Sequence, residues 1–545
     1  MPVIGDRQIR RRLAIRPHRH DLCGGTMSPT PYDSPFNRRA LLRMGLVAGA
    51  AVAGVPLLSA CGDDDEQPSP AAAGGGSLTV LKVGAPNAVT DAEAGNPLLT
   101  SIGATLIVMR HVYDSLMVLD NGEYKYQLAE SVQPNADGSV WTINLRSGVT
   151  FHDGKPVTAA DVVHSIRTLG AKPSNRASVY ANVDLAKVTA VNDRTVTVPL
   201  LTPRGDFKEA VLVVFSPVFP AGMTEFSKPI GSGPYRLAER NGTTTRLVAN
   251  EQYWGGKPSV AELQIVGILD AGARLSALKA GQVDYAVSIS STGAKTEAAN
   301  SELTVVRGGP ANANALSFAM NQKLAPFDDV RVRQAVRLAV DRQALVDNAL
   351  LGLGSTADDV VGKSLPGYAD LPARARDLEQ AKRLFAEAGI TKLTLRTGEI
   401  VPGMLNASRL MAQQLKEAGV ELTLQEISPD AYYADLMTLA THPFQAFYYV
   451  NRPAAVHLSA VTHGKAPFNV TGTSAAYQAR LAKAQATVDD NARAEAFKAL
   501  QEEFYKEGGD LLWGFQEQLD AARKGISGVR TMQSVQLFDR ATGPA

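Results

Sequence analysis

Both cysteines of this chain lie near its start. The sequence has 545 residues, and its two cysteines are Cys23 and Cys61. The body of the chain after Cys61 therefore has no internal disulfide and no thiolate ligands for a structural zinc ion. Its folding must depend on burial of a hydrophobic core, which this length supplies over two or three domains of about 150 residues each.

Cys61 also ends a segment typical of export signals. Arginines precede an apolar run, Gly45 to Ala60, that is shorter than the roughly 20 residues of a membrane span. The run closes with Leu58-Ser-Ala-Cys61, which resembles a bacterial lipobox, where the cysteine receives diacylglycerol. We predict that residues 1–61 are an export signal with Cys61 as the lipidation site. Residues 62–77, rich in acids, proline and glycine, are predicted to be a flexible tether.

The paired Arg38 and Arg39 resemble a twin-arginine signal, and an ordinary Sec signal with adjacent arginines is the alternative. The first 26 residues would make this signal unusually long, so we expect translation to start at Met27. The mature protein would then be extracytoplasmic, anchored by lipid to the outer face of the cytoplasmic membrane.

Charge argues against a nucleic-acid partner. The whole chain has a formal net charge of +1. Residues 1–61 carry nine arginines and three aspartates, so the rest has 46 basic and 51 acidic side chains and a net charge of −5. Nucleic-acid binding needs a basic domain or patch, which this balance does not indicate.

Segments with strand and helix patterns alternate after residue 78. Strands are predicted at Leu78–Val83, Trp141–Leu145, Arg194–Val198 and Val420–Leu424. Helices are predicted after Thr158 with Asp161 completing a capping box, after Asp329, over Asp377–Ala388 ending at Gly389, and over Ala407–Ala418. This alternation favours an α/β fold in which helices cover sheets.

Six segments resemble a known family when taken in order. They are Trp141–Leu169, Pro229–Tyr235, Asn250–Pro258, Ala277–Tyr285, Pro326–Val336 and Asp377–Gly389. Together they resemble the family 5 extracellular solute-binding proteins of ABC importers, the peptide, nickel and oligosaccharide binders, here in a lipoprotein form. The resemblance extends from about Leu78 to Val529.

The resemblance implies an α/β, two-lobed, type II periplasmic-binding-protein-like clamp with an extra α/β domain inserted in lobe I. Lobe I would comprise residues 78–113, 226–316 and 515–545, the inserted domain II residues 114–225, and lobe III residues 317–514. The hinge is then expected near Leu316–Asn321 and Trp513–Phe515. A small-molecule organic solute, either peptide-like or anionic or sugar-like, would bind between the lobes and pass intact to an ABC permease and its ATPase.

The resemblance therefore implies a monomeric binding protein that is not an enzyme and holds no cofactor. The sequence also lacks a G-x-S-x-G elbow and an H-E-x-x-H motif. His152 precedes a glycine turn without a nucleophile partner, and a structural role is predicted for it. A lipoprotein that senses a ligand without transporting it remains an alternative.

The ligand is the least determined feature. Peptide-binding members resemble W-x-x-D-Y-x-D-P in lobe III, where an aspartate holds the peptide ammonium. The matching stretch, Phe444 to Pro453, has Asn451 and Arg452 in place of the acid. Loss of such a charge partner costs about 2–5 kcal/mol, which argues against a standard peptide. Arg452 suits a carboxylate or phosphate, unless it lies in a surface loop.

Aromatic side chains are further candidates for the cleft. We predict ligand contacts from Tyr448, Tyr449, Trp513 and Phe515, with core packing as the alternative for each. His442, His457 and His463 raise a metal-chelate, nickel-type alternative. Their spacing fits no fixed ligand pattern, so no metal site is predicted.

Overall fold

The computed structural model describes residues 78–90, 93, 95–99, 103–120, 122–462 and 468–544, without the side chains of Asp430, Leu436 and Met437. The predicted export signal and tether, with Arg38, Arg39 and Cys61, lie outside these residues. Within the described ranges, no helix combines the length and apolar character needed to cross a bilayer.

Lobe I is built on a seven-stranded mixed sheet in the order β12-β19-β11-β1-β10-β9-β8. Its strands are β1 (Leu78–Ala85), β8 (Tyr235–Asn241), β9 (Thr244–Ala249), β10 (Val260–Gly267), β11 (Tyr285–Ala286), β12 (Leu303–Arg307) and β19 (Leu519–Arg523). Strand β1 pairs in parallel with β10 and β11, and the other neighbours are antiparallel.

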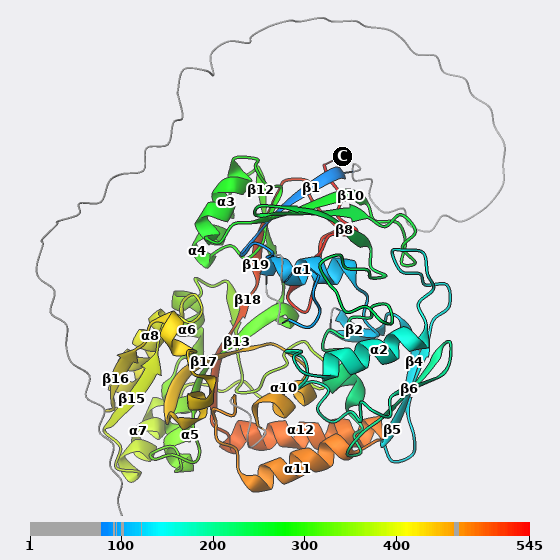
Figure 1. The fold of residues 1–545 in the computed structure, drawn as a ribbon. Helices are drawn as coiled ribbons and strands as arrows, with labels where there is room; N and C mark the ends of the chain where they lie inside the picture. The colour runs from blue at the N-terminus through cyan, green and yellow to red at the C-terminus, as the bar shows by residue number, and fades with distance from the viewer. Residues whose placement is uncertain are drawn as a thin grey trace, which may run out of the picture. The chain divides into compact units, whose positions relative to one another are not determined.

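Lobe III is built on a six-stranded sheet in the order β14-β18-β13-β17-β15-β16. Its strands are β13 (Ala313–Met320), β14 (Gly354–Thr356), β15 (Lys392–Thr397), β16 (Glu421–Glu426), β17 (Phe444–Val450) and β18 (Asp510–Glu517). Strand β18 leads directly into β19 of lobe I, as the red part of the ribbon in Figure 1 shows.

The inserted domain holds a four-stranded antiparallel sheet in the order β4-β5-β7-β6. Its strands are β4 (Ala129–Pro134), β5 (Val140–Leu145), β6 (Thr189–Asn192) and β7 (Thr195–Pro199). Two hairpins complete the strands, β2 (Met117–Asp120) with β3 (Glu123–Tyr126), and β20 (Arg530–Met532) with β21 (Val535–Leu537).

Helices cover these sheets. In lobe I and the inserted domain they are α1 (Gly103–Val112), α2 (Ala159–Gly170), the π-helix η1 (Lys208–Leu212), α3 (Ala271–Lys279) and α4 (Ser291–Glu297), followed by the 3₁₀ turn η2 (Pro310–Asn312). In lobe III they are α5 (Val330–Ala339), α6 (Arg342–Ala349), α7 (Leu378–Glu387), α8 (Met404–Glu417), α9 (Pro429–Tyr432), the 3₁₀ turn η3 (Leu436–Thr441), α10 (Ala454–Val461), α11 (Ala475–Ala486) and α12 (Asp490–Glu507).

The capping signals in the sequence place the helix ends correctly. Asp161, the third residue of α2, accepts hydrogen bonds from the backbone N–H and the hydroxyl of Thr158, each at 2.7 Å. Asp377 accepts from the N–H of Gln380 at the start of α7, and Gly389 follows its end with φ +69°. The helix predicted from Ala407 begins three residues earlier, at Met404.

Two large hydrophobic cores fix the lobes. The first runs from the sheet of lobe I into the inserted domain, joining Leu81 and Val108 to Trp141. The second lies in lobe III, where Phe318 and Trp513 of the sheet pack with Met411 of α8. Burial on this scale stabilises each lobe without disulfides, at about 25 cal/mol per Å² of apolar surface.

The expected domain boundaries at 316/317 and 514/515 fall inside β13 and β18. These two strands pair with each other from Ala313 opposite Glu517 to Ala319 opposite Asp510. We therefore propose that the chain crosses between the lobes at residues 308–312 and at Gln518, just outside the paired region.

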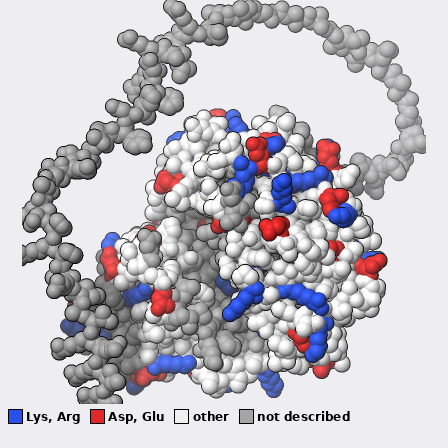
Figure 2. All heavy atoms as spheres, viewed as in Figure 1, with Lys and Arg blue, Asp and Glu red and all other residues white. Residues whose placement is uncertain are grey.

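Surface charges of both signs are interspersed on the face seen in Figure 2, so no single-sign field covers that face.

Candidate binding site between the lobes

The two crossing segments are hydrogen-bonded to each other. The N–H of Gly308 donates to the carbonyl of Gln518 at 2.9 Å, and the N–H of Gln518 donates to the carbonyl of Asn312 at 3.3 Å. The side chain of Asn312 donates to the Gly308 carbonyl at 3.0 Å and accepts from the N–H of Ser534 at 2.9 Å. Asn312 therefore ties both crossings to the β20–β21 turn of lobe I.

Two cavities lie on either side of Asn312, and each has walls from both lobes. The larger, of about 310 Å³, is lined by apolar residues together with several uncharged polar side chains, and we call it the amide cavity. Lobe I contributes Ser288 and Ser290, and lobe III contributes Asn314 and Gln516. Glu517 also lines it and is paired with Arg307 at 2.8 Å. This cavity offers hydrogen-bond donors and acceptors with little unpaired charge.

The smaller cavity, of about 200 Å³, is named here the arginine cavity. Its lobe I and inserted-domain wall includes Arg110, Glu209, Phe215 and Gln533, and its lobe III wall includes Asn451, Arg452 and Val456. Enclosure by two lobes, an apolar lining and a few convergent polar groups are typical of small-molecule sites.

Arg110 is the most buried cation of the arginine cavity. It projects from α1, and its guanidinium lies 4.3 Å from the ring centre of Phe215. One terminal nitrogen donates to Oε1 of Gln533 at 2.6 Å, while Nε has no hydrogen-bond partner. Burial, and then the charge of Arg176, lower the pKa of Arg110 to about 9. The guanidinium is thus cationic at neutral pH and incompletely satisfied.

Glu209 gives the same cavity its carboxylate. It lies in the π-helix η1, a rare conformation that often occurs at functional sites. Its Oε1 accepts from Arg493 of α12 at 3.3 Å, and its Oε2 is buried without a partner. Burial raises the pKa of Glu209, and the nearby charge of Arg493 opposes that shift.

The structure brings only two of the six predicted contact residues to a cavity. Asn451 and Arg452 line the arginine cavity. Asn451 is engaged with the protein itself, since its amide donates to the carbonyls of Pro310 at 2.7 Å and Lys363 at 2.9 Å and accepts from the N–H of Gly362 at 2.8 Å. Arg452 donates from Nε to the Val450 carbonyl at 3.3 Å, and burial lowers its pKa.

The predicted aromatic contacts lie elsewhere. Trp513 and Phe515 are fully buried within lobe III, and Trp513 stacks on Phe318 with ring centres 6.3 Å apart. The Tyr449 hydroxyl donates to Asp510 at 3.1 Å. Tyr448 is half-buried against the core of lobe III, with its ring edge-on to that of Tyr433. None of the four lines either cavity.

Arg110, Phe215 and Gln533 were not predicted from the sequence. Arg110 stands alone as a cation in a helix that is otherwise largely apolar, and eight of its ten residues are buried. A single arginine within such a pattern was the available signal, because arginine is almost never buried unless it has a partner. Phe215 and Gln533 join it through long-range packing, which no local pattern marks.

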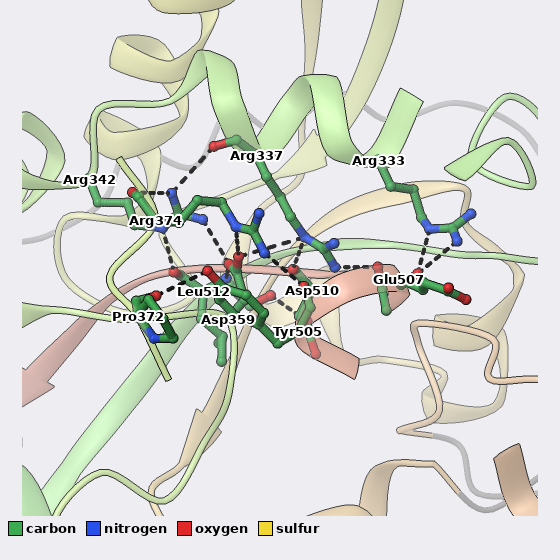
Figure 3. Close-up of polar contacts among 12 residues, drawn as sticks. Arg333, Arg337, Arg342, Asp359, Pro372, Arg374, Tyr505, Glu507, Asp510 and Leu512 are labelled. Carbon is green, nitrogen blue, oxygen red and sulfur yellow. Dashed lines mark hydrogen bonds and ion pairs between the residues drawn. The ribbon is translucent and has the colours of Figure 1, made fainter. Parts of the chain in front are cut away.

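A buried ion cluster supports the strands next to the crossings, as Figure 3 shows. The carboxylate of Asp359 lies 2.8 Å from Arg342, 2.8 Å from Arg374 and 3.8 Å from Arg337. Although burial opposes it, the three guanidiniums hold the pKa of Asp359 below its usual value. The Nε of Arg337 also donates to the Asp510 carbonyl at 2.8 Å, which ties β18 to α5.

The histidines and other possible ligands form no metal centre among the residues described. His457 is buried with its ring edge-on to Tyr449 at 4.8 Å between ring centres, His442 is half-buried, and His463 lies outside the described ranges. No group of three or more His, Cys, Asp or Glu side chains suited to a metal ion occurs in the described part. His152, as predicted, has a structural role, because its ring contacts the Gly233 carbonyl at 3.0 Å and accepts from the N–H of Gly231 at 3.3 Å.

Comparisons with known proteins agree with this architecture. The chain is 28% identical over 388 residues to the oligopeptide-binding protein AppA of Bacillus subtilis, covering 64% of this chain and 69% of AppA. It is 29% identical over 310 residues to the glutathione-binding protein GsiB of Pectobacterium atrosepticum, covering 54% of this chain and 59% of GsiB.

Solved structures show the same fold. AppA from Bacillus subtilis in complex with a nonapeptide superposes with a TM-score of 0.67 at 22% identity, covering 87% of this chain and all of that one. NikA from Brucella suis in complex with Fe(III)-EDTA gives 0.75 at 20% identity, covering 85% of this chain and 99% of that one. The sequence profile of the bacterial extracellular solute-binding proteins, family 5 Middle, matches residues 123–490. The chain therefore belongs to the family 5 bacterial extracellular solute-binding proteins.

Proposed function

We propose that this chain is the lipid-anchored solute-binding subunit of an ABC importer, which captures a small organic solute between lobes I and III and delivers it intact to a membrane permease. The observation that most supports this proposal is that both cavities beside Asn312 have walls from both lobes. A solute in contact with both walls binds the closed form more tightly than the open one. It therefore shifts the population toward closure by its differential affinity.

The proposed solute is not a standard peptide with a free ammonium group. Relatives include proteins named for binding oligopeptide and glutathione. Where peptide binders of the family would place their aspartate, this chain has Asn451, which carries no charge and is engaged by three backbone groups. Arg452 beside it adds a positive charge to the same cavity.

The decisive experiment starts from the mature domain purified from its own host. Native mass spectrometry should reveal a co-purifying small solute. Adding that solute to the stripped protein should decrease the radius of gyration measured by small-angle X-ray scattering. Capture of the permease by the loaded protein would then separate transport from ligand sensing. Chemical turnover of the solute, or an unchanged radius on saturation, would contradict the proposal.

The anchor is a separate part of the proposal and rests on the sequence around Cys61. Cys61→Ser should move the protein from the membrane fraction to the soluble fraction, whereas Cys23→Ser should leave it membrane-bound. Replacing Arg38 and Arg39 by lysine should block export if the twin-arginine route is used. Continued export of that variant would indicate the Sec route.

A further inference from the structure

The arginine cavity carries a positive charge that the protein does not neutralise. Among the residues described, no carboxylate forms an ion pair with Arg110, a residue that is only 8% exposed. Its Nε has no hydrogen-bond partner, and its guanidinium contacts the uncharged side chains of Gln533 and Phe215. Burying an arginine without a counter-ion costs several kcal/mol, so such a charge persists where a ligand compensates it.

A second arginine adds to the excess of positive charge near Arg110. The guanidinium of Arg176 lies 5.0 Å from the centre of the Phe215 ring that Arg110 also covers. Its side chain donates to the carbonyls of Pro97 and Phe215 and pairs with no carboxylate in the described ranges. Phe215 has φ +20°, a strained backbone value for a residue other than glycine, and it lines the cavity.

The opposite wall provides a third guanidinium. Arg452 of lobe III lines the same cavity and also lacks a carboxylate partner among the residues described. An anion between Arg110 and Arg452 would be held by one cation from each lobe. In the closed form both guanidiniums would contact the same anion. Because the open form lacks one of these contacts, the anion would favour closure.

The remaining lining limits the kind of anion. Glu209 is the carboxylate of this wall, and its pair with Arg493 leaves Oε2 buried and unpartnered. A dianion such as a phosphate monoester would meet stronger repulsion from Glu209 than a monoanion would. Leu119, Phe215, Leu365 and Val456 supply apolar contacts around the charged groups. The planar fork of arginine matches a carboxylate in bidentate geometry.

We propose that the arginine cavity binds the carboxylate of a small, largely apolar organic acid, with Arg110 as its anchor, Arg452 as the donor that closes over it and Phe215 as its apolar contact. This inference rests on the proposed function and names the class of solute. It assigns no role to the amide cavity.

The test uses matched acids and amides on the mature protein at constant ionic strength. The probes are benzoate with benzamide, 3-phenylpropionate with its amide, hexanoate with hexanamide, and phenyl phosphate. Thermal unfolding and isothermal calorimetry should show stabilisation by at least one acid and at least tenfold weaker binding of its amide. Equal binding of acid and amide, a preference for phenyl phosphate, or no stabilisation by any acid would overturn the assignment.

Variants connect the selectivity to Arg110. Arg110→Gln should weaken acid binding by at least tenfold and abolish the preference over the amide, while Arg110→Lys should keep part of that preference. Arg409→Gln is the matched control, because Arg409 is exposed and paired with Glu426 at 3.2 Å on lobe III. Retained acid selectivity in a folded Arg110→Gln protein would remove Arg110 from the site. If that variant does not fold, the ratio of acid affinity to amide affinity, measured for Arg452→Gln and for the wild type, decides whether the cavity binds the carboxylate.

The outcomes separate the organic-acid assignment from the proposed function. A neutral or cationic solute that co-purifies and closes the lobes would support the proposed role as a solute-binding protein and overturn the organic-acid assignment. A protein that binds no solute and shows no closure would contradict both.

Discussion

Glu209 of the π-helix and Arg493 of α12 form an ion pair at 3.3 Å that connects the inserted domain to lobe III. Their side chains are only 12% and 7% exposed. Near Glu209 in the sequence, the N–H of Gly205 donates to the carbonyl of Gln485 at 2.7 Å, which adds a contact with α11 of lobe III. Because Glu209 also lines the arginine cavity, the proposed solute site and the contact between lobes share one side chain.

Glu209→Gln should favour the open form of the ligand-free protein. The variant keeps a hydrogen-bond acceptor but loses the charge that pairs with Arg493, which should destabilise the closed form by about 1–2 kcal/mol. Small-angle scattering should report a larger radius of gyration. Glu503→Gln is the control, since Glu503 pairs with Arg480 at 3.0 Å within lobe III alone. An identical response of both variants would argue against a role for Glu209 in closure.

Gly205→Ala should hinder closure sterically. A Cβ at Gly205 would lie 1.8 Å from the carbonyl oxygen of Thr487 in lobe III, so the methyl group cannot be accommodated while the two segments touch. We expect at least tenfold weaker solute binding with little loss of thermal stability, because separation of the lobes relieves the clash. Gly222→Ala is the control, since no atom lies within 4 Å of its Cβ. Its φ of +81° costs about 1 kcal/mol of stability but leaves the lobes free to close.

Asp510 should make stability depend on pH in a defined window. Burial raises its pKa to about 6, against the hydrogen bonds from Ser317 at 2.6 Å and Tyr449 at 3.1 Å. A carboxyl with a raised folded-state pKa is costly to ionise, so wild type loses stability relative to Asp510→Asn as pH rises from about 4 to above 6. The expected difference is about 3 kcal/mol.

Urea unfolding at pH 4 and pH 7.5 measures this effect. The gap in unfolding free energy between Asp510→Asn and wild type should widen as the pH rises. A gap that stays constant, or that narrows as pH rises, would mean that Asp510 does not titrate in this window.

Phe515→Leu should reduce stability without changing solute affinity. The ring is fully buried among alanines, valines and aromatic residues of lobe III, and it lines neither cavity. Losing part of that volume costs about 1–3 kcal/mol. Arg452→Ala should show the reverse, with nearly unchanged stability and weaker solute binding. Denaturant unfolding and calorimetry on both variants make the comparison. A change in affinity for Phe515→Leu at constant stability would return this residue to the list of contacts.

Local signals in the sequence were sufficient for much of the fold. Asp161 and Asp377 identify helix starts because a cap acts within one turn, and Gly389 identifies a helix end because it adopts a positive φ. The family resemblance carried by ordered segments is confirmed by the profile match over residues 123–490.

The residues of the candidate site could not be predicted from such local signals. Strand β17 is buried on both faces over Phe444–Phe447, so alternation cannot separate cleft-facing residues from core residues there. Trp513 and Phe515 lie on β18, whose eight residues are all buried. Arg110 and Arg452 are 342 positions apart in the sequence, and only the approach of the two lobes brings them to one cavity.

The hydrogen-bonded crossings at Gly308–Asn312 and Gln518 have a consequence for recognition by a membrane partner. As the pivots of the proposed closure, these two neighbouring crossings would leave the lobes essentially one rotation, so that a single angle would describe every bound state. Chemically different cargoes that produce the same angle would display the same outer surface. A transporter that reads this angle needs no contact with the cargo, and its fidelity is set by how far each molecule lets the lobes rotate.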